Sequence, residues 1–131
     1  MKLEGTKVII NKTAAELYLF LNDFNNYKEL MPEQITNWSA TQSSCAFTIQ
    51  GMASVELAFG KNTPNTSIEL LPQGKTPFSF SLHVNLTEIG EQTEAGVVLD
   101  ADLNPMLAMM AKRPMENLVN VMGQNLKSIL G

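Results

Sequence analysis

Apolar and polar side chains alternate in short runs through the middle of the chain. The clearest run spans residues 78–86, where the apolar members are Phe78, Phe80, Leu82, Val84 and Leu86. A period of two is typical of a β-strand with one buried and one solvated face. The same alternation recurs, less regularly in the first case, at residues 35–41, 43–50, 53–59, 66–71 and 96–103. Clusters of Gly, Pro, Asn and Thr separate most of these runs, so we predict an antiparallel sheet with one dry face.

The start of the chain predicts a strand followed by two short helices. Residues 3–11 alternate like a strand, and Thr13 with Glu16 three positions later forms a capping-box pattern. An apolar stripe continues from there along one helix face, made of Leu17, Phe20, Leu21 and Phe24. A second short helical turn follows and stops at Pro32.

A long helix is predicted over residues 105–130. Asn104 is a good N-cap residue, and Pro105 suits the first helical position. At about 100° per residue, one apolar face collects Leu107, Ala111, Met115, Leu118, Met122, Leu126 and Ile129. Pro114 cannot donate a backbone hydrogen bond, so we expect the helix to bend near Met110.

The chain of 131 residues is 44% hydrophobic, which suits one globular domain covering residues 1–131. The predicted order is a strand, two short helices, about six strands and one long helix. This is an α+β arrangement, and the terminal helix is the obvious cover for the dry face of the sheet.

The segment KVIINKTAAELYLFLNDFNNYKELMP, residues 7–32, resembles the start of the START/Bet v 1-like superfamily, also called SRPBCC or the polyketide cyclase/dehydrase and lipid transport group. Asp23, Tyr27 and Pro32 match the turn that follows the first helix in that family. The resemblance implies a helix-grip fold. In it, a curved antiparallel sheet of six to seven strands wraps around the C-terminal helix, with two short helices between the first and second strands.

The same resemblance implies binding or carriage of a hydrophobic small molecule, such as a lipid, an isoprenoid or a polyketide, in an apolar cavity between sheet and helix. Two alternatives remain, because one fold hosts many functions. In the first alternative, the chain is an enzyme of the cyclase/dehydrase type that uses Tyr27, Asn125 or Glu33 at the cavity mouth. In the second, it is a protein-interaction domain with a filled core.

Methionine dominates the long helix, which holds five of the chain's eight. Met fills irregular space and repacks around different partners, so a methionine-lined pocket is predicted, with a plain methionine-filled core as the alternative. Met106 and Met109 are expected near its mouth or exposed. The predicted cavity residues are Tyr27, Trp38, Phe47, Phe59, Phe80, Met110, Met115, Leu118, Met122 and Asn125. Tyr27 and Trp38 have packing as their alternative role, and Asn125 has a hydrogen bond to the backbone.

Candidate chemistry is sparse, so we predict no catalytic residue, metal site or cofactor. The one histidine, His83, falls on the polar side of its strand, and one His with one Cys cannot form a zinc site. Asp100 and Asp102 share a strand face that is more typical of solvated surface than of a calcium site.

Charge excludes two further partner classes. The net charge is −4, and the nine basic residues are scattered, which argues against nucleic acid and acidic membranes. The sequence has no apolar run of membrane-spanning length, so no membrane insertion is expected.

Cys45 is the only cysteine and cannot form an intramolecular disulfide. A cytoplasmic location is the expectation, and the sequence leaves the oligomeric state open.

Overall fold

The computed structural model describes residues 1–74, 76 and 78–131. Its helices are α1 (Ala14–Leu21) and α2 (Pro105–Leu130), with two single 3₁₀ turns, η1 (Phe24–Asn26) and η2 (Lys28–Leu30), after α1. The strands are β1 (Lys2–Glu4), β2 (Val8–Ile10), β3 (Ile35–Ala40), β4 (Ser44–Ile49), β5 (Ala53–Phe59), β6 (Ser67–Gln73), β7 (Ser79–Ile89) and β8 (Gln92–Asp102).

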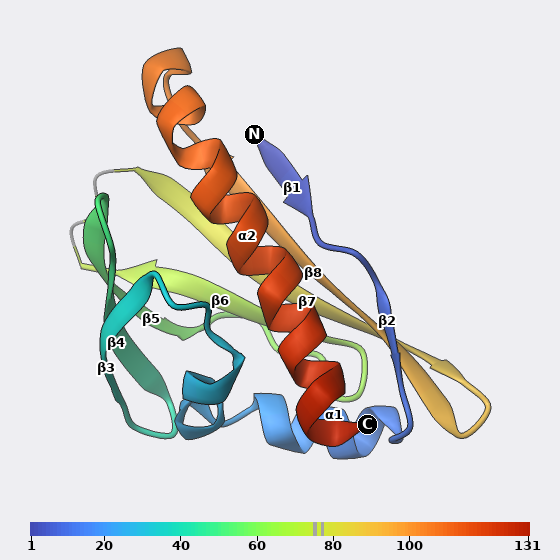
Figure 1. Cartoon of the computed structure of the whole chain (residues 1–131). Helices are drawn as coiled ribbons and strands as arrows, with labels where there is room; N and C mark the ends of the chain where they lie inside the picture. The colour runs from blue at the N-terminus through green and yellow to red at the C-terminus, as the bar shows by residue number, and fades with distance from the viewer. Residues whose placement is uncertain (75, 77) are drawn as a thin grey trace.

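All strands join one antiparallel sheet in the order β1-β8-β7-β6-β5-β4-β3, and β2 also pairs with β8. The sheet curls around α2, which runs diagonally across its concave face, while α1 and the 3₁₀ turns lie near the C-terminal end of that helix (Figure 1). This arrangement confirms the predicted helix-grip architecture. The apolar members of the alternating runs face inward, as in β7, where Leu82, Val84 and Leu86 are buried.

The first strand differs from its prediction, because it is divided into β1 and β2. Between the two, the backbone N–H of Thr6 donates to Oδ1 of Asn120 on α2 at 2.8 Å. Here the chain turns one backbone group toward the helix, while the N–H of Gly5 still donates to the carbonyl oxygen of Val97 on β8 at 2.9 Å. The sheet has eight strands where six to seven were expected.

This N-terminal segment also changes which sides of α2 are buried. The predicted face is confirmed for Ala111, Met115, Leu118, Met122 and Leu126, but Ile129 is exposed. Val119 and Gly123 are buried as well, because the chain around Gly5 packs against them. The backbone approaches so closely that a Cβ atom at Gly5 would lie 2.6 Å from the carbonyl oxygen of Val119.

The two ends of α2 are held differently. At the C-terminal end, the N–H of Asn11 donates to the carbonyl oxygen of Gly131 at 2.9 Å, and Lys127 Nζ bonds the carbonyl oxygen of Ile9. At the N-terminal end, Asn104 caps the helix, but Met106, Met109 and Met110 are 75%, 84% and 66% exposed. The helix continues through Pro114. Its first turns thus carry an exposed apolar surface, as expected for Met106 and Met109.

Candidate functional site

A small cavity lies between the concave face of the sheet and α2; we call it the inner cavity. Its volume is about 20 Å³, which is room for about one water-sized molecule. The described residues that line it are all apolar: Met31, Phe47, Ile49, Leu57, Phe78, Phe80, Leu82, Leu99, Met115 and Leu118. A space with no hydrogen-bonding groups around it stays dry.

The strand register explains why these side chains meet. Leu82 on β7 is directly opposite Leu99 on β8, and both point inward. On the helix, Met115 and Leu118 are three residues apart, so they lie side by side on the face that covers the sheet. Alternation in the strands and helical spacing in α2 therefore bring side chains from distant parts of the chain to one apolar space.

Four of the predicted cavity residues line the inner cavity together, namely Phe47, Phe80, Met115 and Leu118. Trp38 joins them indirectly. Its ring stacks on that of Phe47, with centroids 5.6 Å apart and planes at 15°. A β-bulge between Thr36 and Ser39 interrupts the register of β3 and contains this residue. Bulges re-aim side chains, which accounts for the irregular pattern at this strand in the sequence.

Two other predicted residues, Tyr27 and Phe59, belong to a separate aromatic cluster. The ring of Phe24 stacks on Phe59 with centroids 4.2 Å apart and packs against Tyr27 at 5.1 Å. The Tyr27 hydroxyl donates to the carbonyl oxygen of Leu21 at 2.8 Å. Burial, with a smaller effect of Cys45, raises the pKa of this hydroxyl, so Tyr27 stays a neutral packing group.

The remaining three predicted residues are spread along α2, outside the lining of the inner cavity. Met122 is buried in the core, whereas Met110 is mostly exposed. The side-chain amide of Asn125 donates to the backbone carbonyl oxygen of Leu30 at 3.1 Å. Asn125 thus makes the hydrogen bond to the backbone that is its alternative to a ligand contact.

Six lining residues were not among the predicted cavity residues, and all but one carried a usable signal. The alternation in the sequence places Ile49, Leu57, Phe78, Leu82 and Leu99 on the inward faces of their strands, so choosing among them required the register and curvature of the sheet. Met31 lies outside any alternating run, in the loop after η2. Only its position immediately before Pro32 marked it as part of a fixed turn.

A second, open space borders the inner cavity; we call it the outer cleft. It has a volume of about 380 Å³, and all its lining residues come from one stretch of chain: Lys28, Met31, Pro32, Glu33, Ile35, Thr36, Asn37 and Trp38. Met31 lines both spaces. The outer cleft is therefore adjacent to the inner cavity across a single side chain.

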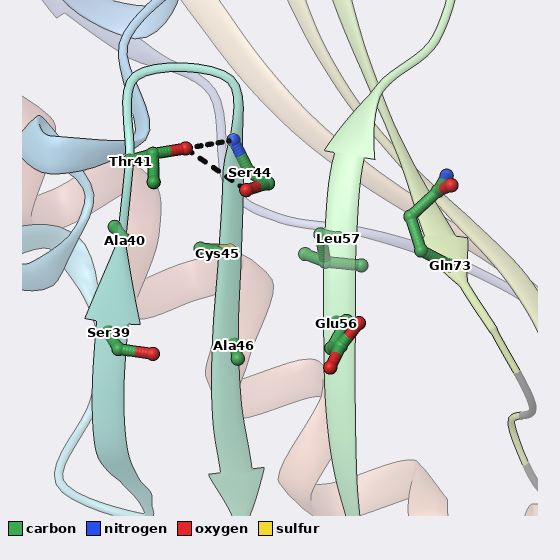
Figure 2. Close-up of a pocket in the computed structure, with 9 residues that line it drawn as sticks. All are labelled: Ser39, Ala40, Thr41, Ser44, Cys45, Ala46, Glu56, Leu57 and Gln73. Atoms are coloured by element: carbon green, nitrogen blue, oxygen red, sulfur yellow. Dashed lines mark hydrogen bonds between the residues drawn. The ribbon is translucent and has the colours of Figure 1, made fainter.

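A third hollow of about 310 Å³ lies on the convex face of the sheet, across β3, β4 and β5 (Figure 2). Thr41 Oγ1 accepts from the N–H of Ser44 at 3.2 Å and bonds its hydroxyl at 3.0 Å, which closes the turn at its end. Glu56 stands alone on β5 opposite Ala46. Among the described residues, none with a nucleophilic side chain forms a hydrogen bond with Glu56, and Cys45 is buried, so this groove is a shallow polar surface.

The described part of the chain supplies little other chemistry. His83 lies on the convex face, 3.2 Å from Ser81 Oγ and 3.7 Å from a carboxylate oxygen of Glu69. Among described residues, no three His, Cys, Asp or Glu side chains converge as a metal site would require. The helices in the described ranges include none with the length and apolar character needed to cross a membrane.

Comparisons with known proteins find structural relatives only. No protein-family model and no curated protein sequence matches the chain. A START superfamily protein from Mycobacterium smegmatis is 17% identical, with a TM-score of 0.70 over 98% of this chain and 96% of that one. KanY protein gives 0.80 at 10% identity, covering 99% and 97% of the two chains. The Aha1 dimer from Colwellia psychrerythraea gives 0.65 at 14% identity, covering 99% and 96%.

These similarities extend over nearly the whole chain at low identity, so they establish the fold and leave the activity open. The eight-stranded curved sheet, the early short helices and the terminal helix across the concave face agree with them. The chain has the START/Bet v 1-like helix-grip fold, as the N-terminal motif indicated.

Proposed function

We propose that the protein binds a hydrophobic small molecule between the sheet and α2, with a lipid-, isoprenoid- or polyketide-like chain as the ligand class. The observation that carries the proposal is the wholly apolar lining of the inner cavity. Each CH₂ group moved from water into such a space gains about 0.8 kcal/mol. A chain of several carbons would therefore gain enough to bind without any polar contact.

The inner cavity must expand to accept such a chain, because it now holds about 20 Å³. Methionine lowers the free-energy cost of this expansion, since its unbranched side chain changes shape by rotating about three bonds. Met31 and Met115 stand on two sides of the cavity, in the loop after η2 and on α2. Their rotation would open space while the backbone of the sheet stays in place.

Thermal shift with straight-chain alcohols of increasing length tests the proposal. We expect several members to raise the melting temperature of the wild-type protein. Met115→Ala should enlarge the cavity, lower the stability by about 2–5 kcal/mol and increase the shift that the alcohols cause. Met122→Ala is the matched control, because Met122 is also buried on α2 but does not line the cavity. If no alcohol shifts the wild type or Met115→Ala, ligand binding is refuted.

A protein-interaction domain is the second candidate, and the exposed Met106, Met109 and Met110 favour it. Large apolar side chains gathered at the surface often mark binding sites. The enzyme alternative has less support, because no ionisable side chain lines the described part of the inner cavity. General acid–base chemistry would have to come from the outer cleft, where Glu33 is a lining residue.

A further inference from the structure

The wall between the outer cleft and the inner cavity is thin at three points. Met31 borders both spaces. Trp38 of the cleft stacks on Phe47 of the cavity, and Ile35 of the cleft is paired across the sheet with Ile49 of the cavity. Trp38 and Ile35 are fixed by these partners. Met31 is the flexible member of the wall, because it is half-buried and lies in the loop before Pro32.

Building on the proposed function, we propose that the ligand is a single-chain amphiphile with an uncharged polar end. Its apolar chain passes Met31 into the inner cavity, and its polar end stays in the outer cleft. Met31 is then the side chain that moves aside, and the lining of the cleft selects the polar end. This assigns a binding role to Lys28, Met31, Glu33 and Trp38 in addition to the cavity residues.

The backbone around Met31 is held in place, so opening falls to its side chain. The N–H of Met31 donates to the carbonyl oxygen of Lys28 at 3.3 Å, and Asn125 bonds the carbonyl oxygen of Leu30 just before it. Pro32 restricts Met31 to the extended region, where it has φ −82° and ψ 143°. The thioether side chain keeps its rotational freedom. The opening motion is therefore a rotamer change that leaves the fold unaltered.

The charges of the cleft favour an uncharged polar end. Lys28 and Glu33 are both exposed, and neither forms an ion pair with another described residue. Because they have opposite signs, the lining of the cleft carries no net charge that would attract an ionic end. Thr36 and Asn37 add a hydroxyl and an amide to the lining. A hydroxyl group can donate and accept there, and it gives up no ionic hydration on entering.

Trp38 provides the measurement, since it is the only tryptophan of the chain. Two brominated forms of dodecanol are titrated into wild-type protein, because bromine quenches tryptophan fluorescence. One carries the bromine beside the hydroxyl carbon, and the other carries it on the terminal carbon. The proposal expects stronger quenching by bromine beside the hydroxyl, because that end stays next to Trp38. Stronger quenching by terminal bromine would overturn the proposed orientation. Unlabelled dodecanol should also bind more tightly than dodecanoate and dodecylamine. If either charged analogue binds more tightly than dodecanol, the assignment of an uncharged polar end is overturned.

Stopped-flow fluorescence tests the passage at Met31. Met31→Ala should raise the association rate of dodecanol by about threefold or more, because no bulky side chain has to move. Met31→Phe, which is stiffer, should lower the rate by a similar factor. Met52→Ala is the control, because Met52 is also half-buried but lines neither space.

The outcomes separate the passage from the proposed function. If dodecanol binds the wild type but all three variants associate at the wild-type rate, the passage is elsewhere and ligand binding stands. If neither dodecanol nor its charged analogues bind the wild type, both the proposed function and this inference are refuted.

Discussion

The side-chain amide of Asn125 on α2 bonds the backbone carbonyl oxygen of Leu30 at 3.1 Å. The two residues are 95 positions apart in the chain, so the bond ties the terminal helix to the end of η2. Leu30 directly precedes Met31, which separates the outer cleft from the inner cavity. A polar group on a largely apolar helix face thus holds the backbone beside the proposed passage.

Replacing Asn125 by Leu should lower the free energy of unfolding by about 1–3 kcal/mol, because the carbonyl group of buried Leu30 would lose its partner. Urea denaturation measures the change. Gln124→Leu, at the exposed neighbouring position, should change stability by less than about 0.5 kcal/mol. Unchanged stability of Asn125→Leu together with weaker ligand binding would instead favour a direct ligand contact.

Asn37 has a positive φ of 55° in the bulge that also contains Trp38. Glycine tolerates this conformation, whereas a β-branched residue does not. We expect Asn37→Gly to keep nearly the wild-type stability and Asn37→Val to lose about 1–3 kcal/mol. In the valine variant the tryptophan emission should also shift, since the bulge positions Trp38 against Phe47. An unshifted spectrum and unchanged stability for Asn37→Val would show that the bulge does not depend on this conformation.

Gly5 permits the close approach of the N-terminal segment to α2. A methyl group there would lie 2.6 Å from the carbonyl oxygen of Val119, so Gly5→Ala should cost about 1–3 kcal/mol through overpacking. Gly96 is the matched control. A Cβ atom at Gly96 meets only the flexible side chain of Lys7 at 3.4 Å, so Gly96→Ala should change stability by less than about 1 kcal/mol. Equal effects of the two substitutions, measured by urea denaturation, would contradict the packing argument.

Cys45 predicts how stability depends on alkaline pH. Burial raises the pKa of its thiol from the ordinary value of 9.0 to about 12, against a smaller lowering by a backbone hydrogen bond from Leu57. The unfolded chain therefore releases this proton first. Its contribution to stability is complete below about pH 9 and is lost between about pH 9 and pH 12.

Cys45→Ala should accordingly reduce the loss of stability between about pH 8 and about pH 11, although it is less stable than the wild type at pH 8. The comparison with the wild type isolates Cys45 from the lysines and from Tyr27, whose raised pKa acts in the same direction. Parallel stability–pH curves for the two proteins would show that the thiol titrates normally in the folded state.

Local periodicity was sufficient to predict most of the strands and helices, and the resemblance of residues 7–32 supplied the helix-grip arrangement. The alternation in residues 78–86 corresponds to the buried face of β7, and the Thr13–Glu16 capping box is present at the start of α1. The helix surface was predicted less well, because burial of Val119 and Gly123 depends on where the distant N-terminal segment packs. Ile129 shares the helical spacing of the buried residues, but it lies in the last turn and is exposed.

The candidate site was harder to predict than the fold. Phe47 and Phe59 both belong to inward faces of neighbouring strands, yet only Phe47 lines the inner cavity, while Phe59 stacks on Phe24. Sequence periodicity specifies that both face inward and is silent on strand register, which places Val55 opposite Phe47 and puts Phe59 at the far end of β5. Met31 lies in a loop, where no period exists, so its position between two spaces follows from tertiary structure alone.

The methionines differ enough in exposure for oxidation to test their placement. Dilute hydrogen peroxide should first convert Met106, Met109 and Met110 to sulfoxides, because they are exposed, while buried Met115 and Met122 should react only when the protein opens. Peptide mapping by mass spectrometry over time measures each rate.

Met31 adds a ligand-dependent readout to the same experiment. It is half-buried, so its oxidation rate should lie between those of the exposed and the buried methionines. Bound dodecanol should slow its oxidation, because the chain passing Met31 shields the sulfur atom, and the rates of exposed Met106 and Met109 should not change. Protection of the exposed methionines instead, with Met31 unaffected, would indicate that the alcohol binds the surface of α2, and the proposed passage would fail.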